Sequence, residues 1–145
     1  MSKPLTPTVA IFRKRLLSYS ETFIADQGKL LPTYRPIYCG YQKDDSGAHL
    51  LDGSTRILLE EHSGMAALSK FLFRRGLGGG KAWIRAIRGQ SPRLLHAHFL
   101  NDGLDAVKLA HSLGLPAITR YTDMTSPSMT MRSRKPASTD AFLRR

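Results

Sequence analysis

Residues 93–119 read RLLHAHFLNDGLDAVKLAHSLGLPAIT, and this stretch decides the fold. Its opening, Leu94–Phe99, is an apolar run that predicts a buried strand. Because side chains alternate between the two faces of a strand, His96 and His98 are expected to point the same way. Asn101 follows where a helix N-cap belongs. The stretch therefore begins with a strand that leads into a helix.

Apolar residues at helical spacing define one face of this helix, at Ala106, Leu109, Ala110 and Leu113. Gly114 and Pro116 predict where the helix ends, since glycine suits the position after the last turn and proline cannot continue it. Ala117–Thr119 then begins a second short apolar run. Strand, helix and strand together predict a right-handed βαβ crossover in a parallel sheet.

A second strand–helix unit lies near the N-terminus. An apolar run within Pro7–Phe12 predicts a buried strand, and a basic corner at residues 13–15 follows it. Ser20 is the predicted N-cap of a helix that ends at Pro32. Two such units in one chain predict an α/β fold: a Rossmann-like parallel sheet with flanking helices over residues 3–119.

Polar side chains follow the carboxyl ends of both strands, where ligands bind in open parallel sheets. This placement predicts a candidate site that contains Ser20, Glu21, Thr22, His98, Asn101 and Asp102. Arg13 and Arg15 are the cations that would attract phosphate groups of a ligand there. A structural alternative stays open, in which Asn101 only caps its helix and His96 is a satisfied histidine between sheet and helix.

Between the two units the chain predicts further strands at Pro36–Cys39 and Thr55–Leu59, separated by a polar surface loop at Lys43–Ser54. A helix is predicted over Glu60–Arg75, with a core-facing stripe of apolar residues at Met65, Leu68, Phe71 and Leu72.

The four glycines in Gly76–Gly80 predict a break between helices rather than a dinucleotide-binding loop, since no strand leads into them. A basic amphipathic helix is predicted over Lys81–Arg88, with Trp83 packed in the core and the arginines in water. The alternative for this helix is contact with an anionic membrane. No cofactor site is indicated, and the two histidines lack the further ligands that a metal ion would need.

Composition limits the function classes. The chain has 145 residues, 41% hydrophobic and 23% charged, which is ordinary for one globular domain. The single cysteine, Cys39, excludes an internal disulfide, favours a reducing cytoplasm and is expected in the core. The net charge of +11 predicts attraction to anions such as nucleotide phosphates, nucleic acid or an acidic membrane. No zinc-finger spacing or arginine-rich helix with interleaved aromatics supports nucleic-acid binding.

Two segments carry a resemblance. HAHFLNDG followed by a helix and GLPAIT is similar to the HAHF…G…A…LGIP…T segment of family-four glycosyltransferases. The run SETFI at residues 20–24 resembles the opening of one branch of the same family. Leu16–Tyr19 replaces the glycine-rich loop that many members have at this point.

The resemblance implies an acceptor-side N-terminal domain of a GT-B fold. Such enzymes transfer a sugar from a nucleotide donor, with retention, during polysaccharide or glycolipid synthesis. A sugar or lipid-linked acceptor is the implied partner, and peripheral contact with the inner face of the membrane is an open possibility. The family's paired glutamates are missing, because Glu21, Glu60 and Glu61 are the chain's only glutamates. We therefore expect a truncated, cytoplasmic glycosyltransferase fragment that neither binds the nucleotide-sugar donor nor catalyses transfer.

Residues 120–145 form a basic tail rich in serine and threonine, which we expect to be disordered. The family continues here with histidine, glycine, an aromatic residue and aspartate. One permitted set of codons for residues 120–127, read in another frame, encodes Leu-His-Gly-Tyr-Asp-Val-Thr. We therefore interpret the tail as the product of a frameshift near Arg120.

Two other functions stay open. The first is a small basic binding protein that holds RNA or anionic lipid, and RNA binding of that kind would fall steeply with salt. The second is a hydrolase that uses His96 or His98. The sequence argues against the hydrolase, because it contains no G-x-S-x-G nucleophile elbow.

Overall fold

Five parallel strands form the central sheet of the structure, a computed structural model that describes residues 6–120. The strands lie in the order β5-β3-β1-β6-β7. Their bounds are β1 Thr8–Phe12, β3 Arg35–Gly40, β5 Thr55–Leu58, β6 Pro92–Ala97 and β7 Ala117–Thr119. The predicted α/β fold with a Rossmann-like parallel sheet is therefore confirmed.

The strand order reverses beside β1. From β1 the chain moves outward through β3 to β5, and it then returns to the other side of β1 to add β6 and β7. The crevice between the carboxyl ends of β1 and β6 is thus the topological switch point, the position where open α/β sheets bind ligands.

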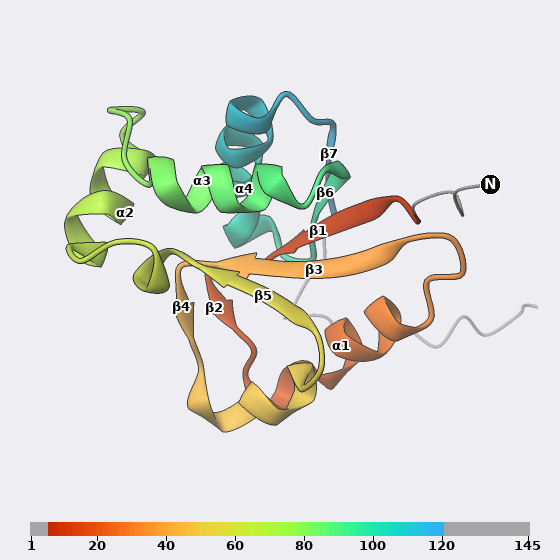
Figure 1. The fold of residues 1–145 in the computed structure, drawn as a ribbon. Coiled ribbons are helices and arrows are strands. Elements are labelled where there is room, and N and C mark those ends of the chain that lie inside the picture. Colours follow the sequence, from red (N-terminus) through yellow and green to blue (C-terminus); the bar gives the residue numbers. More distant parts are fainter. Residues whose placement is uncertain (1–5, 121–145) are drawn as a thin grey trace, which may run out of the picture.

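Helices cover both faces of the sheet (Figure 1). Helices α3 (Lys81–Gly89) and α4 (Leu100–Leu113) lie on one face, and α1 (Thr22–Lys29) lies on the other. Successive side chains of β1 point to opposite faces of the sheet, so this strand contributes to the hydrophobic core on each face. Phe12 packs with residues of α3 and α4, whereas Ile11 packs with residues of α1.

Short elements gather where β1 and β3 end. They are the two-stranded sheet of β2 (Arg15–Leu16) and β4 (Gln42–Lys43), and the 3-10 helices η1 (Tyr19–Glu21), η2 (Asp45–Leu51) and η3 (Leu59–Glu61). The surface loop predicted at Lys43–Ser54 is therefore wrong in part. It contains η2, and Leu51 is buried against the core on the α1 side.

The predicted βαβ unit is present, but its helix starts earlier than expected. Helix α4 begins at Leu100, so its N-cap is Phe99 and Asn101 lies within the first turn. The physical reason is burial, because the Phe99 ring belongs to the core and fixes where the extended chain ends. The predicted end is confirmed. Gly114 has φ +70°, and its N–H donates to the carbonyl of His111 at 3.2 Å.

The first helix also starts differently from the prediction. Ser20 does not cap it; the chain turns at Ser18, which precedes η1, and α1 begins at Thr22. The backbone N–H of Ser18 donates to the Glu21 carboxylate at 3.2 Å, so this carboxylate closes the turn from within.

The two middle helices differ in burial. Helix α2 (Ala66–Arg74) buries Phe73, whereas Met65, Leu68 and Phe71 are exposed, so the predicted core-facing stripe is wrong. Leu72 is only half-buried. The prediction for the next helix is confirmed, because Trp83 is fully buried and donates its Nε1–H to the carbonyl of Ile57 at 3.1 Å.

The glycine-rich segment Gly76–Gly80 connects α2 to α3, as expected for a break between helices. A side chain cannot replace Gly79, since its Cβ would lie 2.1 Å from the carbonyl oxygen of Ser69. Cys39 is buried in the core, as predicted. The predicted tail lies outside the described residues apart from Arg120. In residues 6–120, no helix combines the length and apolar character that a bilayer span requires.

Gly114→Ala tests the end of α4. Alanine in the left-handed region should lower the free energy of unfolding by about 1–2 kcal/mol. The matched control is Gly89→Ala in α3, where a Cβ meets open space and φ is not positive. Alanine there should raise stability by about 0.5–1 kcal/mol. Urea denaturation measures both, and equal effects of the two variants would contradict this account.

Candidate functional site

Arg13 stands at the switch point, directly after β1, and binds two carboxylates from distant parts of the chain. Its Nη1 donates to Asp102 Oδ2 at 2.6 Å, across 89 positions of sequence. Its Nε and Nη2 donate to Glu21 Oε1 at 3.0 and 2.5 Å. These three residues, called the Arg13 cluster below, join the segment after β1 to the first turn of α4.

Burial makes this cluster energetically important. Asp102 is fully buried and Glu21 is 6% exposed, and buried carboxylates are tolerated only when they are paired. The Arg13 guanidinium also lies 4.3 Å from the centroid of the Phe99 ring, a cation–π contact. Burial alone would lower the pKa of Arg13, but its hydrogen bonds to Glu21 and Asp102 raise it overall. The guanidinium therefore stays charged.

A second set of ion pairs lies beside the first. Lys14 Nζ lies 3.9 Å from Asp102 Oδ1 and 3.7 Å from Asp105 Oδ2, and it also donates to the carbonyl of Asn101. Arg74 of α2 approaches Asp105 at 3.3 Å. Asp105 is buried, so Lys14 and Arg74 compensate a carboxylate that water does not reach. Together the two sets hold α2 and α4 near the end of β1.

His98 directly follows β6 and is almost completely buried, at 2% exposed. Within the described residues neither of its ring nitrogens has a hydrogen-bond partner. Its ring centroid lies 4.3 Å from that of His96, so the two imidazoles share one face as predicted. Burial, and then the nearby His96, Arg120 and Arg13, lower the pKa of His98 to about 4. His98 is therefore neutral at pH 7.

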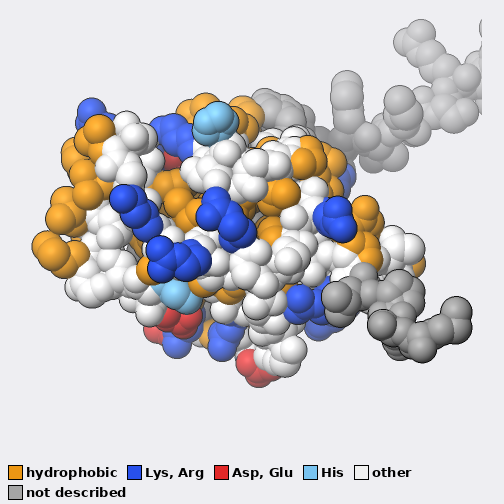
Figure 2. All heavy atoms as spheres, turned by 45° about the horizontal axis from the view of Figure 1, so that its top comes forward, with side chains coloured by type: hydrophobic (Ala, Val, Ile, Leu, Met, Phe, Trp, Pro, Cys, Tyr) orange, Lys and Arg blue, Asp and Glu red, His pale blue; other side chains and the backbone are white. Residues whose placement is uncertain are grey.

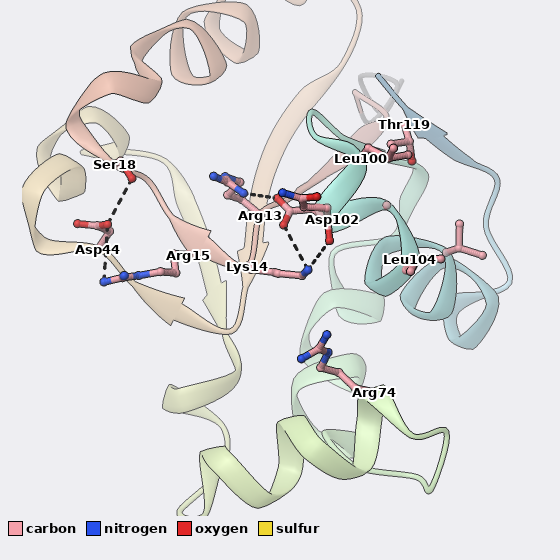
Figure 3. A pocket seen from close by; sticks show the side chains of 13 residues that line it. Arg13, Lys14, Arg15, Ser18, Asp44, Arg74, Leu100, Asp102, Leu104 and Thr119 are labelled. Atoms are coloured by element: carbon pink, nitrogen blue, oxygen red, sulfur yellow. Dashed lines mark hydrogen bonds and ion pairs between the residues drawn. The ribbon is translucent and has the colours of Figure 1, made fainter. Parts of the chain in front are cut away.

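A hollow of about 1040 Å³ opens at the switch point (Figure 3). One wall is apolar and consists of Leu100, Leu104 and Val107 on α4, all more than half exposed. The other wall carries polar and charged groups, which are Arg13, Lys14, Arg15, Ser18 and Asp44. Such a volume accommodates a small molecule, and the two walls suit a ligand with one polar and one apolar part.

The predicted site residues separate into two groups. The structure brings Arg13, Glu21 and Asp102 together. It also places Arg15 and Asn101 at the hollow, with the Arg15 guanidinium exposed and 3.8 Å from Asp44.

The second group lies away from the hollow. Ser20 and Thr22 are exposed and do not line the hollow, and the buried His98 does not line it either. Whether any predicted residue binds an acceptor stays a prediction.

Sequence reasoning missed Lys14, Ser18, Asp44, Arg74 and Asp105. One signal was available, because Asp102 and Asp105 are three residues apart and Asp105 directly precedes the apolar helix face that begins at Ala106. Carboxylates on a core-facing helix surface require cationic partners, and the basic corner at residues 13–15 is the nearest supply at that sheet edge.

The described residues contain no group of three or more His, Cys, Asp or Glu side chains arranged to hold a metal ion. The His96–His98 pair accordingly lacks a third protein ligand of these types there. The buried carboxylates of the site instead bind arginine and lysine.

Arg13→Ala should destabilise the protein strongly, because it removes the cation of buried Glu21 and leaves buried Asp102 with only the more distant Lys14. The expected loss in the free energy of unfolding is about 3–5 kcal/mol. Arg15→Ala removes an exposed cation two positions away and should cost less than about 1 kcal/mol. Chemical denaturation at pH 7 compares the two, and similar losses would show that the Arg13 cluster is not a major source of stability.

The lowered pKa of His98 predicts a pH dependence of stability. The unfolded chain takes up a proton near the ordinary pKa of 6.5, whereas the folded chain does so only at about 4. The contribution of neutral His98 to the free energy of unfolding is therefore fully present above pH 6.5. It falls as the pH drops from 6.5 towards 4, by up to about 1.4 kcal/mol per pH unit.

Denaturation at pH 7 and pH 5 tests this expectation. Between pH 7 and pH 5, the free energy of unfolding of His98→Gln should fall by about 1–2 kcal/mol less than that of wild type. The control is His111→Gln, which changes an exposed imidazole on α4 and should behave like wild type. An unchanged pH dependence in His98→Gln would contradict the assignment.

Comparison of the chain with protein-family models, with curated proteins and with solved structures finds no match. Its function is therefore inferred from the residues and geometry described above.

Proposed function

We propose that this chain is the acceptor-side half of a retaining glycosyltransferase of the family-four type, without transfer activity of its own. One observation carries the proposal. The two segments that resemble the family meet at the switch point, where Glu21 of SETFI and Asp102 of HAHFLNDG bind the same guanidinium of Arg13. Both segments therefore contribute to the ligand-binding edge of the sheet, where an acceptor-side domain would hold its acceptor.

The hollow supports an acceptor that combines a polar and an apolar part. Arg15, Ser18 and Asn101 offer hydrogen-bonding groups to a sugar or a phosphate. Leu104, which is 77% exposed, offers apolar surface to a lipid chain. A sugar or lipid-linked acceptor is thus the substrate class that this half would hold.

Transfer itself needs groups that this chain lacks. The donor side of the family carries paired glutamates, whereas Glu21 is occupied by Arg13 and the only other glutamates are Glu60 and Glu61. Neither lines the hollow. We therefore expect no binding of the nucleotide-sugar donor and no turnover.

Exposed apolar surface supports the view that further elements pack here in a complete enzyme. Ile118 is 53% exposed on β7, which is an edge strand of the sheet. Apolar faces and sheet edges of this kind are normally covered. A frameshift near Arg120 would remove the covering elements, so the chain should be only marginally stable.

Sequencing of the gene downstream of the codon for Arg120, with translation in all frames, tests the proposal. We expect a shifted frame that soon reads His-Gly-aromatic-Asp and later contains two glutamates eight positions apart. Purified protein should transfer no sugar from nucleotide donors, and the frame-restored protein should do so. A stop codon within a few dozen codons, with no glutamate pair beyond it, would contradict the frameshift. A basic binding protein would then be the better interpretation.

A further inference from the structure

Helix α2 and the loop after it expose a group of large apolar side chains, here called the α2 surface. Met65 is 66%, Leu68 45%, Phe71 52% and Leu77 66% exposed. The first three are spaced three residues apart, so they lie along one side of the helix. In Figure 2, hydrophobic side chains gather at the left edge of the molecule, the side where Figure 1 shows α2. Large apolar side chains that are grouped on a protein surface point to an interaction site.

The same part of the chain is strongly basic. Residues 62–101 contain seven Lys and Arg and no Asp or Glu. Around the α2 surface the cations are Lys70, Arg74, Arg75, Lys81 and, from α4, Lys108. The guanidinium of Arg75 lies 5.2 Å from the centroid of the Phe71 ring, so charge and apolar side chain occupy the same surface.

The charge of this surface is only slightly compensated. Asp105 is the acidic residue that lines the adjacent hollow of about 410 Å³, where it pairs with Arg74 and Lys14. Lys70, Arg75 and Lys108 line the same hollow. The surface thus combines a cationic rim with protruding apolar side chains.

We propose that the α2 surface docks the protein on an anionic lipid bilayer. Met65, Leu68, Phe71 and Leu77 enter the headgroup region, while Arg75 and Lys81 meet lipid phosphates. Charge complementarity identifies this partner, because a basic rim around aliphatic side chains matches an acidic headgroup layer above hydrocarbon. RNA fits less well, since single strands are held by stacked aromatic rings and Phe71 is the aromatic residue among the exposed apolar side chains of this surface.

Docking in this way would bring the switch-point hollow to the membrane. Arg74 and Leu104 line both that hollow and the one beside the α2 surface. A bilayer at α2 therefore lies next to the apolar wall of α4. The inference does not depend on sugar chemistry, and it would hold for a protein of another function.

Vesicle flotation of the full chain tests the proposal. The probes are phosphatidylcholine vesicles with and without phosphatidylglycerol, and we expect flotation only with the anionic ones. Arg75→Gln should weaken binding about fivefold, the effect of one cation near an anionic surface. Lys29→Gln is the matched control, since Lys29 is exposed on α1 at the opposite face of the sheet. It should bind like wild type.

A second pair of variants tests insertion. A double variant that carries Leu68→Ser and Phe71→Ser should lose the part of vesicle binding that persists at high salt. Leu30→Ser, at a residue 79% exposed after α1, should leave it unchanged. Because all these side chains are largely exposed, the variants should fold, which circular dichroism can verify. In Phe71→Trp, the fluorescence emission of the new indole should shift to the blue when anionic vesicles are added. The emission of Trp83, which is fully buried, should stay unchanged.

Three results would overturn the proposal. The first is no flotation of wild type with anionic vesicles. The second is an equal loss in Lys29→Gln and Arg75→Gln, which would mean attraction by net charge alone. The third is a combination of two findings: Arg75→Gln weakens RNA binding, and the serine variants of Leu68 and Phe71 do not change vesicle binding. This combination would assign the surface to nucleic acid. A transferase assay has no bearing on any of them.

Discussion

The pairing of one arginine with two buried carboxylates is the constraint on which the site depends. Arg13 leaves β1 at the switch point and binds Glu21 and Asp102, so η1 and the first turn of α4 are fixed relative to the sheet. Both carboxylates are buried, and buried carboxylates are tolerated in a fold only when they are paired. Arg13 and Asp102 of the cluster line the hollow, and their ion pair holds α4, which carries the apolar wall, against the segment that follows β1.

The main features of the fold could be predicted because they depend on local patterns. Alternating burial in strands and the helical spacing of Ala106, Leu109 and Ala110 follow from the geometry of each element. The failures occurred where burial depends on tertiary packing. Phe71 and Leu68 have the spacing of a core face, yet α2 buries Phe73 instead and leaves them in water. No local pattern shows which side of a short helix meets the sheet.

The site was predictable at the level of the sheet edge and no further. A parallel sheet brings the residues after β1 and β6 to one edge, which correctly joins Glu21 to Asp102. The spacing of Asp102 and Asp105 indicates that α4 needs cations at this edge. It does not show which groups pair, because that depends on side-chain positions across 89 residues of sequence. Ser20 and Thr22 adjoin Glu21 in sequence but face water, because only Glu21 turns back to Arg13.

The ion pairs show that the net charge of +11 is not concentrated at the hollow. The carboxylates of α4 and η1 compensate Arg13, Lys14 and Arg74, so the floor of the hollow is close to neutral. Ligand choice in the hollow must therefore come from shape and hydrogen bonding rather than from bulk charge. Within the described part of the chain the uncompensated cations lie instead mainly among residues 62–101, which contain seven Lys and Arg and no carboxylate side chain. Long-range attraction to an anionic partner consequently acts at the α2 surface, and recognition of a small ligand acts beside it at the switch point.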